Sequence, residues 1–249
     1  MTGLKQLLAA GRPVTGVLLR MPAVGLVELA GVAGLDFVLL DCEHGPADTE
    51  QVQHHLNAAD AHGLATLVRV GADEPALVLR VLDLGAQGVV VPHVDTAGQA
   101  AAAVRSAHYP PLGERGFANY SRGAGFGSRS PAEHLDRANA TTLVIPMLET
   151  ETAGANAAAI LAVPGVDAVM PGPADLAVSM SVSGDSGKQR VDATIAEIGE
   201  AAEQAGKPVL RIAGSPEAAR ETGSRFVVYN LTQVLLDALK GLTIAAADR

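Results

Sequence analysis

Residues 142–161, TLVIPMLETETAGANAAAIL, contain the unit from which the rest of the chain is built. The run 142–148 is apolar after its first residue, which is typical of a strand covered on both faces. The alanine-rich segment 151–161 is amphipathic, as expected of a helix that covers one of those faces. A strand followed at once by a helix is the repeating unit of proteins with parallel sheets.

The same unit recurs along all 249 residues. Helical patterns follow most of the apolar runs, for example at 49–61, 74–84, 96–107 and 151–161. The number of units and the chain length together predict one α/β domain, a single (β/α)8 TIM barrel over 1–249. A doubly wound open sheet is the alternative that counting does not exclude. The strands are predicted at 14–19, 36–41, 65–70, 88–92, 142–148, 167–170, 208–212 and 225–229.

One segment, 108–140, interrupts this alternation. The segment is too long for an ordinary connection, and it carries Pro110, Pro111, Gly113, Gly116, Gly123, Gly125 and Gly127. We predict a loop insertion there that shapes a binding site or a subunit contact. The alternative is a surface loop whose arginines, Arg115, Arg122 and Arg129, pair with the excess carboxylates of the protein.

The composition excludes several classes of function. Lys and Arg number 18 against 27 Asp and Glu, a net charge of −9, and only 4 Phe and 3 Tyr supply aromatic rings. This balance argues against binding to nucleic acid or to anionic membranes. The single cysteine, Cys42, excludes an intramolecular disulfide and a multi-cysteine metal site. With no secretion signal of the usual form and no membrane-length apolar run, we expect a soluble cytoplasmic protein.

Ionisable side chains follow five of the eight predicted strands at their carboxyl ends. Active sites of barrels are built at that rim, so the coincidence predicts a catalytic site there. The strand-end residues are Asp41, Glu43 and His44 after the second strand, Arg69 in the third, His93 after the fourth, Glu149 after the fifth and Asp175 after the sixth.

Two of these residues, Glu149 and Asp175, are candidate metal ligands. Two carboxylates on neighbouring strand ends can bind one Mg²⁺ or Mn²⁺ ion and leave positions for water and substrate. The alternative is helix capping, because each residue also lies at the start of a predicted helix. The stretch Gly172-Pro173-Ala174 opens the second of these helices, whose free backbone N–H groups could hold a substrate carboxylate.

A second group, Asp41, Glu43 and His44, suggests proton transfer, because a neighbouring carboxylate fixes the tautomer of an imidazole. The alternative for His44 is a loop histidine satisfied by hydrogen bonds. Arg69 ends an otherwise apolar strand, so it either holds an anionic substrate or forms a structural salt bridge.

Other polar residues are set aside. His54, His55 and His62 lie on or just after a predicted helix and are expected to be solvated, whereas His93 stays a possible site residue. The glycine-rich stretch 123–127 follows no strand and is a poor dinucleotide fingerprint.

Four stretches identify the sequence by resemblance. These are 34–46 (GLDFVLLDCEHGP), 82–92 (LDLGAQGVVVP), 109–116 (YPPLGERG) and 165–176 (GVDAVMPGPADL). In this order they resemble the HpcH/HpaI family of metal-dependent, class II pyruvate aldolases of the 2-keto-3-deoxy-acid type. The resemblance spans residues 4–240 and implies a barrel, in a homo-oligomer that is usually a hexamer with sites near subunit boundaries.

The resemblance also implies roles for individual residues. Glu149 and Asp175 match the metal ligands, His44 the acid/base histidine, and Arg69 the arginine that contacts the keto acid and its enolate. Asp41 and Asp83 match acidic residues associated with that histidine.

Two positions add to this picture. Asp83 precedes its strand and should lie at the opposite end of its own barrel, so it could reach a site only in a neighbouring subunit. Met147 stands where many members carry a glutamine that meets the substrate, which puts the preference for donor or acceptor in question.

The function expected from these residues is that of a divalent-metal aldolase. Pyruvate or a related 2-keto acid loses a C3 proton, and the enolate adds to an aldehyde to give a 4-hydroxy-2-keto acid; cleavage is the reverse. The ion is expected to be Mg²⁺, Mn²⁺ or Co²⁺, acting as a Lewis acid. None of the strand-end residues is a lysine, which favours this route over an imine. The alternatives are a related lyase acting on oxaloacetate or a CoA thioester, and a catalytically silent barrel that binds a keto acid.

Overall fold

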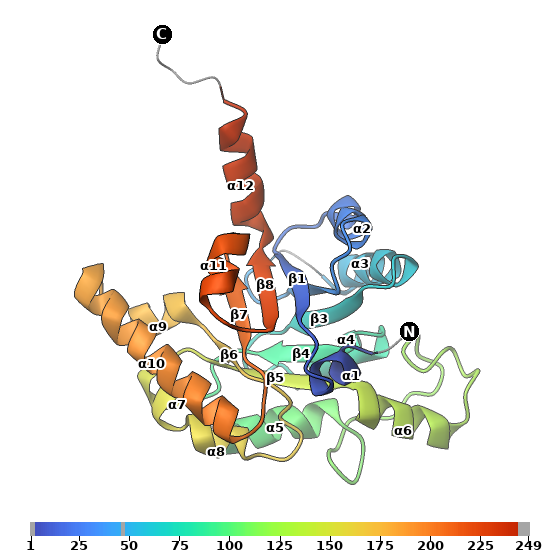
Figure 1. The fold of residues 1–249 in the computed structure, drawn as a ribbon. Coiled ribbons are helices and arrows are strands. Elements are labelled where there is room, and N and C mark those ends of the chain that lie inside the picture. The colour runs from blue at the N-terminus through green and yellow to red at the C-terminus, as the bar shows by residue number, and fades with distance from the viewer. Residues whose placement is uncertain (1–2, 46–47, 244–249) are drawn as a thin grey trace.

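Eight parallel strands form the wall of a barrel, and the helices cover its outside (Figure 1). The computed structural model describes residues 3–45 and 48–243. Hydrogen-bonded neighbours follow the order β6-β5-β4-β3-β2-β1-β8-β7. A parallel bridge between Val169 and Val209 joins the two ends of this order. The predicted TIM barrel is therefore confirmed, and the open doubly wound sheet is excluded.

All eight predicted strands are present. The sixth is the shortest, with two residues; before it, the carboxylate of Asp167 accepts a hydrogen bond from the N–H of Val144 at 2.9 Å. The strands are β1 Val14–Leu19, β2 Phe37–Asp41, β3 Ala65–Arg69, β4 Gly88–Val91, β5 Leu143–Leu148, β6 Met170–Pro171, β7 Leu210–Ala213 and β8 Phe226–Asn230.

Helices follow the strands at nearly the predicted positions. The helix expected over 151–161 is divided in two at Asn156, whose side chain donates a hydrogen bond to the carbonyl of Asp95 at 2.8 Å. The helices are α1 Leu4–Ala9, α2 Val24–Val32, α3 Thr49–Ala61, α4 Pro75–Asp83, α5 Ala97–Ala107, α6 Pro131–Thr141, α7 Glu151–Ala155, α8 Ala157–Leu161, α9 Pro173–Ser179, α10 Gly184–Gln204, α11 Pro216–Glu221 and α12 Leu231–Gly241.

Alternation along the strands sorts the apolar side chains into two layers. One set, including Phe37, Leu39 and Leu67, fills the barrel interior, where the rings of Phe37 and Phe226 meet edge to face at 5.3 Å. The other set, including Val38 and Val68, lies between the strands and the helices. Both layers are closed to solvent, so the polar residues of the interior are confined to its two ends.

The insertion is shorter as a loop than predicted. Its last part is α6, which begins at Pro131 and is capped by a reciprocal pair of hydrogen bonds between Ser130 and Glu133. The remainder is fixed to the barrel by the pair of Arg115 with Asp83. It lies against the end of the barrel at which the strands begin.

Two further features bear on function. His55 was expected to be solvated, which is wrong: it is buried and accepts a hydrogen bond from the N–H of Ala23 at 3.1 Å. Helix α12 extends away from the barrel instead of lying along it (Figure 1). Across the described ranges, every helix is too short or too polar to cross a membrane.

Candidate functional site

The carboxyl ends of β2 and β3 place an arginine and an aspartate side by side. Asp41 and Arg69 are register partners at the last positions of the two strands. The Nε of Arg69 donates to Oδ1 of Asp41 at 2.9 Å, and its NH2 group donates to Oδ2. Arg20 also donates to Oδ2, through Nε at 2.9 Å. Both members of the central pair are buried.

Burial and pairing oppose each other at this pair. Burial alone would raise the pKa of Asp41, but the hydrogen bonds and charge of Arg69 outweigh it, and the pKa lies below its usual value. Burial would lower the pKa of Arg69, but its bond to Asp41 raises the pKa above the usual value, with help from the charges of Glu43 and Glu149. Both groups are therefore ionised near neutral pH.

A second buried carboxylate, that of Glu149, lies across the rim. Its nearest cationic side chain is farther from it than Arg69 is from Asp41. Glu149 follows β5 and is 2% exposed. Its Oε1 accepts a hydrogen bond from the backbone N–H of His93 at 2.7 Å. Burial raises the pKa of Glu149, and the nearby charges of Asp175 and Glu43 raise it further, against the opposing effect of His93. A cation between these carboxylates would relieve that cost.

The capping alternative fails for Glu149. Thr150 caps α7 by accepting a hydrogen bond from the N–H of Ala153 at 3.0 Å. Asp175 lies in the first turn of α9 and forms no cap there; the N-cap position is Gly172, which has no side chain. Both carboxylates thus remain available to a ligand.

The shape of the site fits a metal ion next to Glu149. A Cβ atom on Gly172 would lie 2.8 Å from Oε2 of Glu149 and 2.9 Å from its Cβ, so only glycine leaves this carboxylate in place. Oxygen ligands are those that Mg²⁺ and Mn²⁺ prefer. Among the described residues, no group of three or more His, Cys, Asp or Glu side chains could hold a metal. Two protein ligands leave most positions open to water and substrate.

His93 lies closer to the carboxylates of the site than its place after a strand indicated. Its Nδ1 lies 3.3 Å from Oε1 of Glu149, and its Nε2 lies 3.6 Å from Oε1 of Glu43. Its backbone has φ of +54°, a conformation that is rare for residues other than glycine and is found often at functional sites. The sequence showed only its place after a strand; the backbone conformation that turns it onto Glu149 carries no sequence signal.

His44 is placed differently from what its neighbours in sequence indicated. Its side chain is 59% exposed, and the nearest carboxylate oxygen, on Glu43, is 3.8 Å from Nε2. Oδ1 of Asp41 accepts a hydrogen bond from the backbone N–H of His44 at 3.2 Å, and the same oxygen accepts one from Nε of Arg69 at 2.9 Å. Asp41 therefore holds the backbone of His44 and not its imidazole. The imidazole is thus free to face a substrate over the rim.

Three other residues complete the inventory. Met147, in β5, puts its sulfur 3.8 Å from an NH1 nitrogen of Arg69 and so borders the site. Burial, with help from nearby Asp41 and Glu74, raises the pKa of the Cys42 thiol to about 11, which argues against a nucleophilic role. Asp83 lies at the opposite end of the barrel, 2.6 Å from an NH2 nitrogen of Arg115.

Comparison with known proteins shows which family the sequence and the fold resemble. Residues 19–232 match the model of the HpcH/HpaI aldolase/citrate lyase family. A 2-dehydro-3,6-dideoxy-6-sulfogluconate aldolase of Pseudomonas putida is 38% identical over 81% of this chain and 78% of its own. A hydroxypyruvate/pyruvate aldolase of Cupriavidus necator is 35% identical over 98% of this chain and 91% of its own. A solved structure of a Burkholderia cenocepacia family protein superposes with a TM-score of 0.90 at 36% identity, covering 97% of each chain.

Proposed function

Because the chain belongs to the HpcH/HpaI aldolase/citrate lyase family and is a lyase, we propose that it makes and cleaves 4-hydroxy-2-keto acids from pyruvate, or a related 2-keto acid, and an aldehyde. The observation that carries this proposal is the group of Glu149, Asp175 and Arg69 on one rim. Two carboxylates and one guanidinium match a divalent cation and a keto acid.

Glu149 and Asp175 would hold the divalent ion, with Mg²⁺ and Mn²⁺ as the first candidates and Co²⁺ as a third. When bound, the ion supplies Lewis acidity that lowers the energy of an enolate. Arg69 would add positive charge at the same oxygen, and its bond to Asp41 holds it in place before the substrate arrives. In the stretch Gly172-Pro173-Ala174 at the start of α9, the N–H of Gly172 donates to the carbonyl of Leu148 at 3.1 Å and Pro173 has no N–H. The N–H of Ala174 is therefore the group of this stretch that would contact the substrate carboxylate.

Proton transfer requires a group that can reach the substrate. His44 is exposed on the rim, and we assign it the removal of the C3 proton and the exchange of a proton with the hydroxyl of the aldol product. Asp41 positions Arg69 and the backbone of the turn that carries His44, and so acts through them.

On the side of the site proposed to take the aldehyde, Met147 stands in place of an amide side chain. Met147 offers a polarisable apolar surface beside Arg69, where a glutamine would offer a hydrogen-bond donor. We therefore propose an acceptor whose aldehyde end needs no amide contact at this position.

The donor reaction can be tested without knowing the aldehyde. In heavy water, the methyl signal of pyruvate is expected to decay in the presence of protein and Mn²⁺ or Mg²⁺, and to stop decaying when a chelator is added. Exchange that continues in chelator would contradict metal-dependent chemistry. Absence of exchange with pyruvate, hydroxypyruvate and oxaloacetate alike would favour a silent binding protein.

We also propose that the protein is a homo-oligomer, a hexamer by analogy with its family, held in part by α12. None of the residues of α12 is buried, and Leu236 and Leu239 are 50% and 61% exposed. Helix α2 likewise exposes apolar side chains, with Leu29 at 62% and Val32 at 74%. In a barrel, the last helix normally covers the strands next to the first helix, and here α12 extends away from that place (Figure 1). A second copy that exchanges its α12 would cover both surfaces.

Replacing Leu236 and Leu239 by Asp should therefore break the assembly into smaller species. Light scattering coupled to size-exclusion chromatography gives the mass. Lys240→Asp is the control, since it changes the net charge of the same helix by the same amount on an exposed polar residue. An unchanged mass for the double variant, or an equal loss of mass in the control, would refute the role of α12.

Asp83 faces away from its own site, so any part it takes in catalysis would be in a neighbouring subunit.

A further inference from the structure

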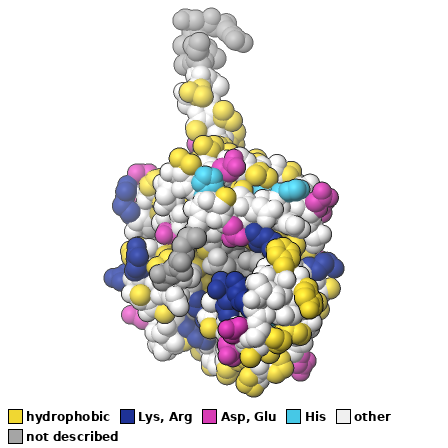
Figure 2. All heavy atoms as spheres, turned by 90° about the vertical axis from the view of Figure 1, so that its right-hand side faces the viewer, with side chains coloured by type: hydrophobic (Ala, Val, Ile, Leu, Met, Phe, Trp, Pro, Cys, Tyr) yellow, Lys and Arg dark blue, Asp and Glu magenta, His cyan; other side chains and the backbone are white. Residues whose placement is uncertain are grey.

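A cavity lies at the end of the barrel opposite the candidate active site. Its volume is about 750 Å³, and residues at the starts of strands, such as Ala65 and Gln87, line it. Its wall also includes residues of α1, α3, α4 and α6 and of the loop that precedes α6. Figure 2 shows a face hollowed near its centre, with Lys and Arg side chains at the edge of the hollow.

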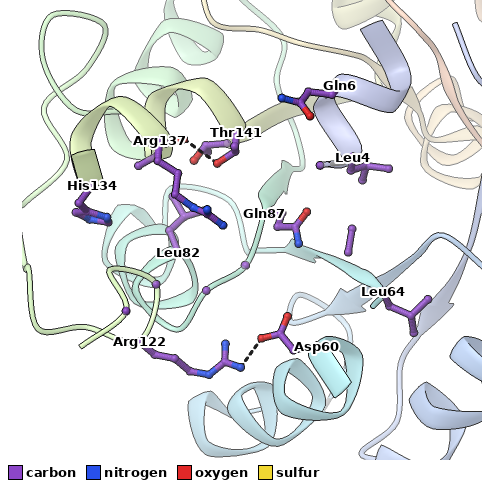
Figure 3. Close-up of a pocket in the computed structure, with 18 of the residues that line it drawn as sticks. Leu4, Gln6, Asp60, Leu64, Leu82, Gln87, Arg122, His134, Arg137 and Thr141 are labelled. Atoms are coloured by element: carbon purple, nitrogen blue, oxygen red, sulfur yellow. Dashed lines mark hydrogen bonds and ion pairs between the residues drawn. The ribbon is translucent and has the colours of Figure 1, made fainter. Parts of the chain in front are cut away.

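The charge of this cavity opposes that of the protein. Four arginines, Arg115, Arg122, Arg129 and Arg137, line it together with two aspartates, in a chain of net charge −9. Arg122 pairs with Asp60 at the edge of the cavity (Figure 3). Within the ranges that the structure describes, no carboxylate lies within 4.0 Å of the guanidinium of Arg129 or Arg137.

One arginine of the wall, Arg115, is almost fully buried. The side chain of Arg115 is 3% exposed; its NH2 group pairs with Asp83, but its Nε has no hydrogen-bond partner among the described residues. Arg115 also lies 4.8 Å from the ring centre of Tyr109. The charges of these arginines also act on His134. Burial lowers the pKa of His134, and the charges of Arg115, Arg129 and Arg137 lower it further.

Glycines in the wall make room for these arginines. A Cβ on Gly85 would lie 2.7 Å from an NH1 nitrogen of Arg122, and a Cβ on Gly125 would lie 2.6 Å from an NH1 nitrogen of Arg129. Both glycines also have positive φ, +106° and +72°. The glycine-rich stretch 123–127, which fits no nucleotide motif, therefore has a local purpose: it lets cationic side chains lie against the backbone.

Apolar and uncharged side chains also line the cavity. Leu4, Leu64 and Leu82 contribute apolar surface, while Gln87 and Arg137 extend into the space between α6 and the strand starts (Figure 3). The exposed surface of the whole lining is more polar than apolar, which suits a small, strongly polar ligand.

We propose that this cavity is a second ligand site, separate from the proposed catalytic rim, that binds a small organic anion through Arg129 and Arg137. The shared chemistry is a group of anionic oxygens, a carboxylate or a phosphate. A planar guanidinium binds either group with two parallel hydrogen bonds.

Calorimetric titration of the assembled, metal-loaded protein tests the site with two probes, inorganic phosphate and succinate. Arg129→Gln/Arg137→Gln should weaken binding of the preferred probe at least about tenfold, since each charge-assisted bond that is lost contributes a comparable factor. Arg105→Gln/Arg220→Gln is the matched control; it removes the same charge from exposed arginines outside the cavity and should bind as the wild type does. The probe that binds more tightly identifies phosphate or carboxylate as the natural group.

Three results would overturn the proposal. The first is no saturable binding of either probe by the wild type. The second is equal weakening in the cavity variant and in the control, which would indicate a general charge effect. The third is loss of binding in Glu149→Gln, which would place the anion at the catalytic rim instead.

Discussion

Glu149→Gln is expected to lower the affinity for Mn²⁺ by at least about a hundredfold and turnover by about a thousandfold. Glu149 is one of two carboxylates that face the proposed ion, so its neutral amide removes half of the protein's charge there. Asp175→Asn should act in the same direction. Calorimetry with Mn²⁺ and steady-state assays of retro-aldol cleavage measure the two effects.

Folding is not expected to suffer in this variant. The pKa of Glu149 is raised in the folded protein, so its charged form opposes folding at neutral pH, and an uncharged amide relieves that cost. The melting temperature of metal-free Glu149→Gln should therefore equal or exceed that of the wild type. Glu151→Gln is the control, because Glu151 lies two residues away and its side chain is 68% exposed.

Gly172→Ala offers an independent check on the same geometry. The added methyl group would collide with both Oε2 and Cβ of Glu149, so it should weaken metal binding without removing a ligand. Wild-type affinity for Mn²⁺ in both Glu149→Gln and Gly172→Ala would show that the ion, if any, binds elsewhere.

Arg69→Met is expected to lower the free energy of unfolding by about 3–5 kcal/mol, because it leaves Asp41 buried beside only one other cation. Methionine keeps the length of the side chain and its contact with Met147. Activity should fall as well, since Arg69 is the cation proposed to add positive charge at the enolate oxygen. Urea unfolding at neutral pH gives the stability difference.

The pH dependence of this difference follows from the sign of the shift. The pKa of Asp41 is lowered in the folded wild type, so its stabilising contribution is complete above the unfolded value of about 3.9. That contribution is lost as the pH falls through the lower folded pKa. In Arg69→Met, burial is no longer outweighed, so the pKa of Asp41 should rise and the stability penalty should shrink as the pH falls.

An exposed ion pair provides the comparison. Arg190→Met breaks the pair with Glu151, in which both side chains are more than half exposed, and should change stability little. A large loss of stability in Arg190→Met, or a negligible loss in Arg69→Met, would contradict the stabilising role assigned to the buried pair.

The barrel could be predicted from the sequence because its periodicity is local. Each strand is a short apolar run, and each helix repeats apolar residues at helical spacing, so both appear in neighbouring residues. The rim could be predicted for the same reason: in parallel strands, a residue after the last apolar position must lie at the carboxyl edge. Glu149, Asp175, Arg69 and Asp41 all lie there as expected.

What the tertiary structure decided is which of these groups meet. The sequence suggested that the carboxylates of Asp41 and Glu43 act on the imidazole of His44, which follows them, but the register of β2 with β3 pairs the carboxylate of Asp41 with Arg69. His93 reaches Glu149 through a positive φ that no residue pattern encodes. The arginines of the cavity come from a loop and a helix that are far apart in sequence from the strand starts they face. Contacts between distant segments depend on the path of the whole chain, so the sequence by itself determined the barrel and its catalytic rim, and the fold determined the partners.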